Sequence, residues 1–274
     1  MSLSISATTE ILGSLNHKPK KKLGQNFLVD GNIVRKSLSM ASLKKGLPVV
    51  EIGPGLGTLT QELLEQNHCV FAVEIDQNLI GNLERKFSKF ITEKKFFLLH
   101  ADAVKNPTGL LPDSVEDFAV VANLPYSISS PWLESLLNSK QIPSTMVLML
   151  QRETLDRMKA PHSTKNYSAL TIFLESVFEY KKVYPVSKQC FFPIPKIDSV
   201  LAKMNRKKKI HLYSPENRTL IRKIFTQRRK QIGSITKKED KEVQTKLYQW
   251  MKKNEIAHSS RPEQIEPFIW QTLP

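Results

Sequence analysis

The sequence predicts an α/β fold, a parallel doubly wound sheet with helices on both faces, followed by a small α-helical C-terminal domain. Short apolar runs alternate with amphipathic stretches from Val49 onward, which is typical of buried strands and covering helices. After about residue 205 the apolar runs stop and polar, helix-like patterns take over. A chain of 274 residues with 40% hydrophobic residues is long enough for these two domains.

Five apolar runs are the expected strands, and three amphipathic segments between them are the expected helices. The runs cover residues 49–53, 69–74, 96–100, 118–123 and 146–150, and the helical patterns cover 59–66, 78–87 and 131–137. Alternating strands and helices of this kind form a parallel sheet that binds ligands at the carboxyl ends of its strands.

The ends of the chain differ from this middle part. Residues 1–17 are polar and predict a flexible tail, and residues 18–205 are expected to form the α/β domain. Helical patterns at 214–230, 241–253 and 262–270 predict a basic helical domain over residues 206–274.

Charge is distributed unevenly along the chain. Residues 181–274 contain 22 Lys/Arg and 8 Asp/Glu, whereas residues 1–180 contain 19 and 18. A basic segment attached to a neutral domain is typical of a surface that docks on a polyanion, because phosphate contacts release counterions. A merely solvated basic surface is the alternative reading.

Composition excludes several other classes of protein. No run of eighteen apolar residues and no signal peptide is present, so we expect no membrane contact. Cys69 and Cys190 have neither the spacing of a zinc site nor that of a disulfide framework. We therefore expect a cytoplasmic protein without a metal site.

A glycine-rich segment follows the first strand and opens a helix, which is where a nucleotide-like cofactor binds. Its glycines are Gly53, Gly55 and Gly57, and Thr60 stands where a dinucleotide fingerprint would have its third glycine. This departure disfavours a pyrophosphate and favours a cofactor without phosphates.

Two acidic residues end the next strands. Glu74 lies 21 residues after Gly53, where a carboxylate can accept hydrogen bonds from ribose hydroxyls, and Asp102 could accept from an adenine amino group. Either acid alone could be a helix cap or a surface charge. Together with the glycine segment they favour S-adenosylmethionine over NAD.

The tetrad Asn123-Leu124-Pro125-Tyr126 ends the fourth strand, beside the expected donor sulfonium. The Asn123 amide oxygen and the Leu124 carbonyl, constrained by Pro125, could both accept from an aromatic amine. Tyr126 could stack on the base that carries this amine. Methyl transfer from a sulfonium depends on orientation and electrostatics, so we expect no catalytic His or Cys.

A second aromatic ring is needed on the other face of the base. Phe191, which opens a loop stiffened by two prolines, is the candidate, and Lys196 of this loop could contact a phosphate. Phe191 could instead be a core residue, and Phe192 competes with it for the stacking role.

Seven motifs in order resemble those of the rRNA adenine N6-dimethyltransferases, which dimethylate two adjacent adenosines near the 3′ end of 16S-type rRNA. The motifs are Lys22-Leu23-Gly24-Gln25-Asn26-Phe27-Leu28, the segment 51–60, Asn123 to Tyr126 with Ser127-Ile128-Ser129, Gln151-Arg152-Glu153, Tyr167-Ser168-Ala169-Leu170-Thr171, the segment 191–199, and Phe225-Thr226-Gln227-Arg228-Arg229-Lys230. Ser127 and Arg152 replace the Asn and Lys that family members often carry.

The resemblance implies further roles. Asn26 and Leu28 would contact the donor together with Gly53, Glu74, Asp102 and Asn123. Arg228, Arg229 and Lys230 would bind 16S rRNA within an immature 30S subunit, and we expect a monomer. A 23S rRNA methyltransferase of the macrolide-resistance type and a non-catalytic nucleic-acid-binding relative are the alternatives.

Overall fold

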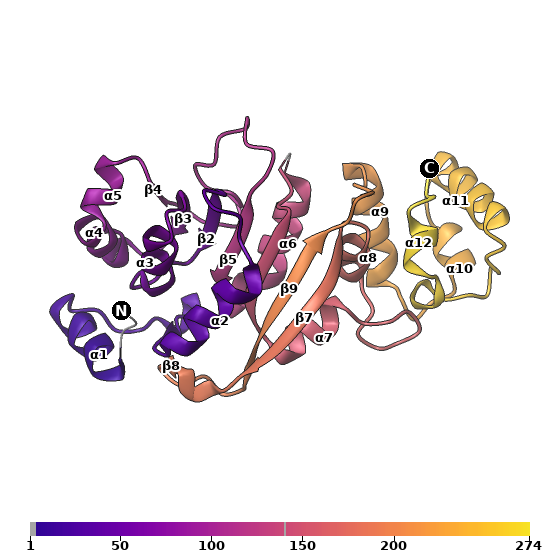
Figure 1. Cartoon of the computed structure of the whole chain (residues 1–274). Coiled ribbons are helices and arrows are strands. Elements are labelled where there is room, and N and C mark those ends of the chain that lie inside the picture. Colours follow the sequence, from indigo (N-terminus) through magenta and orange to yellow (C-terminus); the bar gives the residue numbers. More distant parts are fainter. Residues whose placement is uncertain (1–3, 140) are drawn as a thin grey trace. The chain divides into compact units, whose positions relative to one another are not determined.

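The computed structural model describes residues 4–139 and 141–274 and divides into two compact units (Figure 1). Unit 1 comprises Met1–Thr154 and Glu179–Arg206, and unit 2 comprises Leu155–Phe178 and Lys207–Pro274. The expected boundary near residue 205 is therefore present. Residues 155–178, however, pack with the C-terminal helices rather than with the sheet, which the sequence did not indicate.

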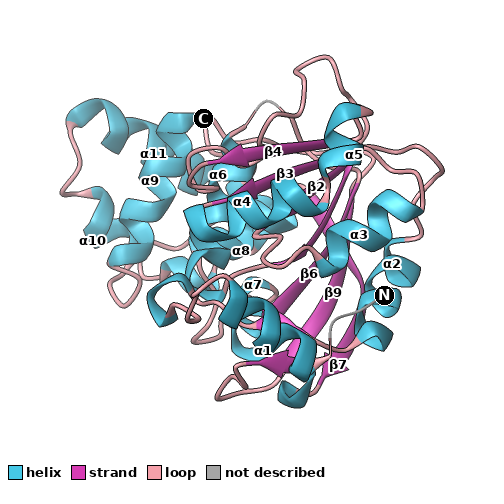
Figure 2. Cartoon of the chain, turned by 90° about the vertical axis from the view of Figure 1, so that its left-hand side faces the viewer, coloured by secondary structure: helices cyan, strands magenta, loops and turns pink. Residues whose placement is uncertain are grey.

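A seven-stranded sheet with the order β4-β3-β2-β5-β6-β9-β7 forms the centre of unit 1 (Figure 2). The five predicted strands are confirmed and pair in parallel; their bounds are β2 Val49–Ile52, β3 Val70–Glu74, β4 Phe96–His100, β5 Ala119–Asn123 and β6 Thr145–Gln151. Strand β9, Ser199–Arg206, pairs antiparallel with β6. The sheet is thus mixed, not purely parallel as expected.

The strand β7, Phe178–Val186, forms the edge next to β9 and was also not predicted. Lys181 and Lys182 are exposed on it, and Pro185 lies near its end. Charged residues and proline are tolerated on an edge strand because one side of its backbone needs no ladder partner. These same residues hide the strand from an apolar pattern.

Helices cover the sheet, as predicted. In unit 1 they are α2 Gly31–Ala41, α3 Thr58–Glu65, α4 Gln77–Lys86, α5 Ser88–Thr92, the short η2 Tyr126–Ile128, α6 Ser129–Asn138 and, at the boundary with unit 2, α7 Arg152–Met158. Val34, Leu63 and Leu83 from three of them share one buried cluster with alternate strand residues such as Val49 and Val70. Since the intervening strand residues are buried as well, both faces of the sheet are covered.

The expectation of a flexible tail over residues 1–17 is wrong for the part that the structure describes; residues 1–3 lie outside it. Helix α1, Ile5–Ser14, is capped by the Ser4 hydroxyl. Leu12 is 4% exposed and packs with Phe27, Leu56 and Leu79. A few apolar residues with helical spacing are therefore buried by the rest of unit 1, although the segment is mostly polar.

A two-stranded antiparallel ladder joins the N-terminal part to a distant loop. Strand β1, Phe27–Leu28, pairs with β8, Phe191–Phe192. The short helices η1, Lys21–Leu23, and η3, Lys188–Cys190, precede these two strands. This ladder brings the Gln25-Asn26 segment and the proline-rich loop into one region of unit 1.

Unit 2 is helical, as predicted, with α8 Ala169–Glu175, α9 Pro215–Thr226, α10 Ile232–Thr236, α11 Lys241–Lys253, η4 Pro262–Gln264 and α12 Pro267–Trp270. Residues 155–178 belong to it because Tyr167 is fully buried there. Its hydroxyl donates to the Ile265 carbonyl oxygen at 3.0 Å, and its ring packs edge-on against Phe225. In the part of the chain that the structure describes, no helix is long and apolar enough to cross a membrane.

Candidate cofactor and substrate-amine site

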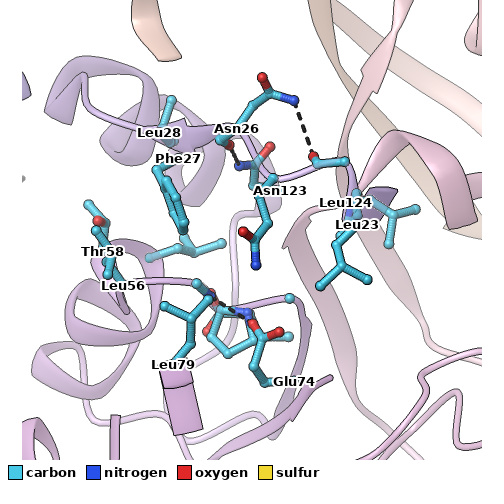
Figure 3. A pocket seen from close by; sticks show the side chains of 18 of the residues that line it. Leu23, Asn26, Phe27, Leu28, Leu56, Thr58, Glu74, Leu79, Asn123 and Leu124 are labelled. Carbon is cyan, nitrogen blue, oxygen red and sulfur yellow. Dashed lines mark hydrogen bonds between the residues drawn. The ribbon is translucent and has the colours of Figure 1, made fainter. Parts of the chain in front are cut away.

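A pocket lies in unit 1 where β2, β3 and β5 end (Figure 3). Residues 23–28 and 123–126 line it together with side chains of the segments 51–59 and 74–79. These segments are the glycine loop, the first acidic strand end, the tetrad and the Gly-Gln-Asn-Phe-Leu segment. The fold therefore gathers sequence motifs that are up to about one hundred residues apart.

The glycine loop forms an open floor for the pocket. Gly53 and Gly55 have φ values of +65° and +59°, which favour glycine. A Cβ atom on Gly53 would lie 3.1 Å from Pro125 Cγ, and one on Gly55 would lie 3.1 Å from Phe27 Cδ1. A side chain at either position would press against Pro125 or Phe27, so this loop requires glycine and leaves its backbone uncovered by side chains.

Glu74 is held rigidly at the pocket wall. Its Oε2 accepts from the Gly55 N–H at 3.2 Å, and its Oε1 accepts from the backbone N–H groups of Ile75 and Asp76 at 2.9 and 3.0 Å. Burial raises the pKa of this carboxyl, and these backbone N–H groups oppose the rise. A carboxylate has about four acceptor positions. Three of them are used here, so Glu74 retains one, on Oε2, for a ribose hydroxyl.

Asp102 lines an adjoining hollow that shares Gly53, Glu74 and Pro125 with the first pocket. Its Oδ1 accepts from the Val104 N–H at 2.8 Å. In residues 4–139 and 141–274, no hydrogen bond reaches its Oδ2. Gly53 and Glu74 thus line both hollows, and Asp102 lines the second, as expected for the ends of adjacent strands.

The Asn123 side chain has a defined orientation in the pocket. Its Nδ2 donates to the Asn26 carbonyl oxygen at 3.0 Å, and the Asn26 Nδ2 in turn donates to the Gly24 carbonyl at 3.1 Å (Figure 3). Because the donor end of the amide is used, Oδ1 is the end that remains to accept a hydrogen bond.

The remaining tetrad residues are also fixed. Leu124 is 1% exposed, which anchors the backbone that carries its carbonyl. Pro125 packs against Gly53. Tyr126 is half-buried, and its hydroxyl forms a 2.5 Å hydrogen bond with Ser199 Oγ, while burial raises the pKa of the phenol. The ring of Tyr126 is therefore held at both ends.

Phe191 does not offer a second stacking face in this structure. Its side chain has no exposed surface and belongs to the core cluster that contains Leu28 and Val34. The alternative reading as a core residue is thus the one the structure supports. Phe192 is half-buried and packs beside Leu12 and Phe27, and Lys196 is exposed on the loop that follows.

Glu51 is a pocket residue that had no role in the sequence prediction. It is 2% exposed, and Thr60 Oγ1 donates to its Oε2 at 2.7 Å. Burial raises the pKa of Glu51 to about 8, although the Thr60 hydrogen bond lowers it. The sequence signal for Glu51 was an acidic residue inside the apolar run 49–53. The hydrogen bond to Glu51 also gives Thr60 a structural role at the position where a dinucleotide fingerprint would have glycine.

The three basic residues expected to contact RNA differ in their surroundings. Arg228 is bound within unit 2, because its Nη1 donates to the Lys165 and Tyr167 carbonyl oxygens and its Nε lies 3.5 Å from Glu263 Oε2. Arg229 and Lys230 are exposed. Arg228 is therefore engaged in the fold, whereas the other two are accessible.

No cluster of three or more metal-ligating side chains occurs in residues 4–139 and 141–274. The chemistry of the pocket rests instead on carboxylates, an amide, backbone carbonyls and one phenol. These groups suit a nucleoside cofactor and an aromatic amine.

The sequence profile described as "Ribosomal RNA adenine dimethylase" matches residues 16–268 of this chain. "Ribosomal RNA small subunit methyltransferase A" of Opitutus terrae is 43% identical over 274 residues, covering 100% of this chain and 98% of the relative. The protein of the same name from Natranaerobius thermophilus is 33% identical, covering 94% of this chain and 91% of its own length.

Two solved structures have the same fold. A dimethyladenosine transferase from Plasmodium falciparum has a TM-score of 0.69 and 26% identity, covering 89% of this chain and 94% of its own. The 23S rRNA methyltransferase ErmE has a TM-score of 0.63 and 25% identity, covering 90% and 98%. Both likenesses extend through the two units.

Proposed function

Because the chain belongs to the ribosomal RNA adenine dimethylase family, we propose that its pocket holds S-adenosylmethionine beside the N6 amine of an adenosine in small-subunit rRNA. The chain is an S-adenosylmethionine-dependent rRNA adenine dimethyltransferase of the small subunit, with a Rossmann-like methyltransferase fold. Two adjacent adenosines near the 3′ end of 16S rRNA, in an immature 30S subunit, are the proposed targets.

The cofactor contacts follow from the pocket. Glu74 would accept from a ribose hydroxyl, Asp102 would accept from the adenine amino group, and the Gly53 loop would let the cofactor approach the backbone. Asn26 and Leu28 close the pocket from the N-terminal side. The backbone of Gly53 and Gly55, which line the pocket without side chains, supports this fit.

The tetrad presents the substrate amine. Asn123 Oδ1 and the Leu124 carbonyl accept hydrogen bonds from the two N–H groups of the amine. These bonds favour a more tetrahedral nitrogen, whose lone pair is less delocalised into the adenine ring and can attack the methyl group. Tyr126 stacks on the base. When bound, S-adenosylmethionine would supply the methyl group: the S–CH3 bond breaks as the N–CH3 bond forms, the sulfonium becomes a neutral thioether, and the nitrogen loses one proton to solvent. The observation that carries this proposal is the Nδ2 hydrogen bond to Asn26, which leaves Oδ1 as the acceptor.

RNA docking is assigned to the basic surface. Residues 207–274 contain 16 Lys/Arg and 7 Asp/Glu, and Arg229 and Lys230 are exposed among them. Lys196 is proposed as a phosphate contact on unit 1. We place the protein in the cytoplasm as a monomer, which is consistent with its two unpaired cysteines and with ribosomal subunits as its substrate.

The substitution Asn123→Ala tests the role of the tetrad. Removing one preorganised acceptor should lower the single-turnover rate on 30S particles by about ten- to a thousandfold, with RNA binding largely intact. Rapid-quench methylation assays and filter binding measure the two quantities. A variant that turns over at the wild-type rate would remove Asn123 from the mechanism.

A second candidate is methylation of 23S rRNA, which the likeness to ErmE favours. The relatives named as small-subunit enzymes are more similar in sequence, at 33% to 43% identity against 25%. The small-subunit substrate is therefore the one proposed.

A further inference from the structure

We propose that Gln25 is a positioning residue for catalysis: anchored to Asp76, it holds the Asn26 carbonyl that orients the Asn123 amide. The Gln25 side chain is hydrogen-bonded to Asp76 and to the Lys20 backbone, whereas its neighbour Asn26 is hydrogen-bonded to Gly24 and Asn123. The inference deepens the proposed role of Asn123 and rests on it.

The Gln25 side chain is fully engaged. Its Nε2 donates to Asp76 Oδ2 at 2.8 Å. Its Oε1 accepts from the Lys20 backbone N–H at 2.8 Å and lies 3.1 Å from His17 Nε2. A side chain held from both ends of its amide group fixes the backbone that carries it.

Asp76 is a rigid anchor. Its side chain has no exposed surface, its Oδ1 accepts from the Asn78 N–H and caps α4, and Lys20 Nζ lies 2.9 Å from its Oδ2. Its own N–H donates to Glu74 Oε1. Burial alone would raise the pKa of Asp76, but the hydrogen bonds from Lys20 and Gln25 leave it lowered, so the carboxylate is ionised. Asp76 thus follows β3, two residues after Glu74, the carboxylate proposed to bind the ribose.

The other end of the connection is the tetrad. A Cβ on Gly24 would lie 3.3 Å from Ser127 Oγ and 3.4 Å from the Tyr126 backbone nitrogen, so the segment lies directly against the tetrad. Asn26 then accepts from Asn123 Nδ2. Gln25 therefore lies between a buried anchor and the group that orients the catalytic amide.

Loss of the anchor would let the Asn26 carbonyl shift and the Asn123 amide rotate. Displacements on the scale of 1 Å lower catalytic rates by up to about a hundredfold. The effect should be larger in turnover than in cofactor binding, because Glu74 and Asp102 keep their hydrogen bonds to the Gly55, Ile75 and Val104 backbone N–H groups when Gln25 is replaced.

The test is the variant Gln25→Met, which keeps the side-chain length but removes the three hydrogen bonds of the Gln25 amide, to Asp76, Lys20 and His17. We expect the single-turnover rate on 30S particles to fall about tenfold, with the KM for S-adenosylmethionine and for 30S changed less than about threefold. Gln61→Met is the matched control, because the Gln61 amide also donates to a carboxylate, Glu65, but away from the tetrad. The control should keep the wild-type rate.

The double variant Gln25→Met/Asn123→Ala separates positioning from general loss of structure. If Gln25 acts through Asn123, the double variant turns over at the rate of Asn123→Ala alone. Multiplication of the two single effects, or a wild-type rate for Gln25→Met, would overturn the inference. A wild-type rate for Asn123→Ala would instead overturn the proposed function, so the two failures are distinguishable.

Discussion

At the scale of residues, the sequence predicted those site groups whose position follows from their strand. Glu74 and Asn123 end the strands β3 and β5, and Asp102 follows β4 by two residues. Parallel strands bring their carboxyl ends together. Phe191 could not be assigned in this way, because its burial depends on pairing with Leu28 across the chain. Nor could Gln25, whose partner Asp76 is fifty-one residues away.

Glu51 makes the free energy of unfolding depend on pH, and a single substitution separates its titration from that of the other ionisable groups. Its pKa is about 8 in the fold and 4.5 for the free side chain, so its contribution is fully present below about pH 4.5 and is lost as pH rises through 8. Glu51→Gln does not titrate. Between pH 6 and 8 the variant should therefore gain up to about 2 kcal/mol in free energy of unfolding relative to wild type.

Urea unfolding of both proteins at several pH values between 6 and 9 measures this difference. The comparison cancels the other titrating groups, since both proteins share them. Parallel stability curves would show that Glu51 is ionised in the fold at pH 6.

At the scale of elements, the strongly apolar strands and the amphipathic helices of unit 1 were predictable from periodicity. The strand β7 was not, because its edge position allows Lys181, Lys182 and Pro185. Helix α1 was missed for a related reason: only a few of its residues are apolar, and their burial comes from Phe27, Leu56 and Leu79. Tertiary contacts, not local propensity, determine both elements.

The substitution Leu12→Ala tests the packing of α1. Removing a side chain that is 4% exposed should cost about 2–4 kcal/mol in free energy of unfolding. Leu110→Ala is the matched control, since Leu110 is 47% exposed and should change stability by less than about 0.5 kcal/mol. Equal stability of the two variants in urea titrations would show that residues 4–17 are a flexible tail and do not pack on unit 1.

At the scale of the whole molecule, the positive charge is shared by both units. The twenty-six residues 181–206 contain 6 Lys/Arg and 1 Asp/Glu. All twenty-six belong to unit 1. The excess of positive charge over residues 181–274 is therefore divided between unit 1 and the predicted basic domain over residues 206–274. The division into units depends on contacts that no local pattern records.

Replacing Arg229 and Lys230 by Ala should weaken binding to 30S particles and reduce the slope of log K against log salt by about 2, one for each phosphate contact. Lys44→Ala/Lys45→Ala, on unit 1, is the control and should leave the slope unchanged. Filter binding at several KCl concentrations measures the slopes. An identical slope for Arg229→Ala/Lys230→Ala and wild type would make these residues a solvated surface.

Arg228→Ala should behave differently from its neighbours. Its contacts to the Lys165 and Tyr167 carbonyls and to Glu263 lie within unit 2, so the variant should lose about 1–3 kcal/mol in free energy of unfolding while the salt slope stays near that of wild type. Denaturant titration together with the same binding assay separates the two effects. A reduced slope with unchanged stability would restore Arg228 as an RNA contact.

The central claim is tested most directly by methylating purified 30S and 50S particles with labelled S-adenosylmethionine and analysing the nucleosides by mass spectrometry. We expect label in 16S rRNA only, recovered as N6,N6-dimethyladenosine, with two modified adenosines per particle. Label that enters 23S rRNA instead, or that stops at a single methyl group, would contradict it.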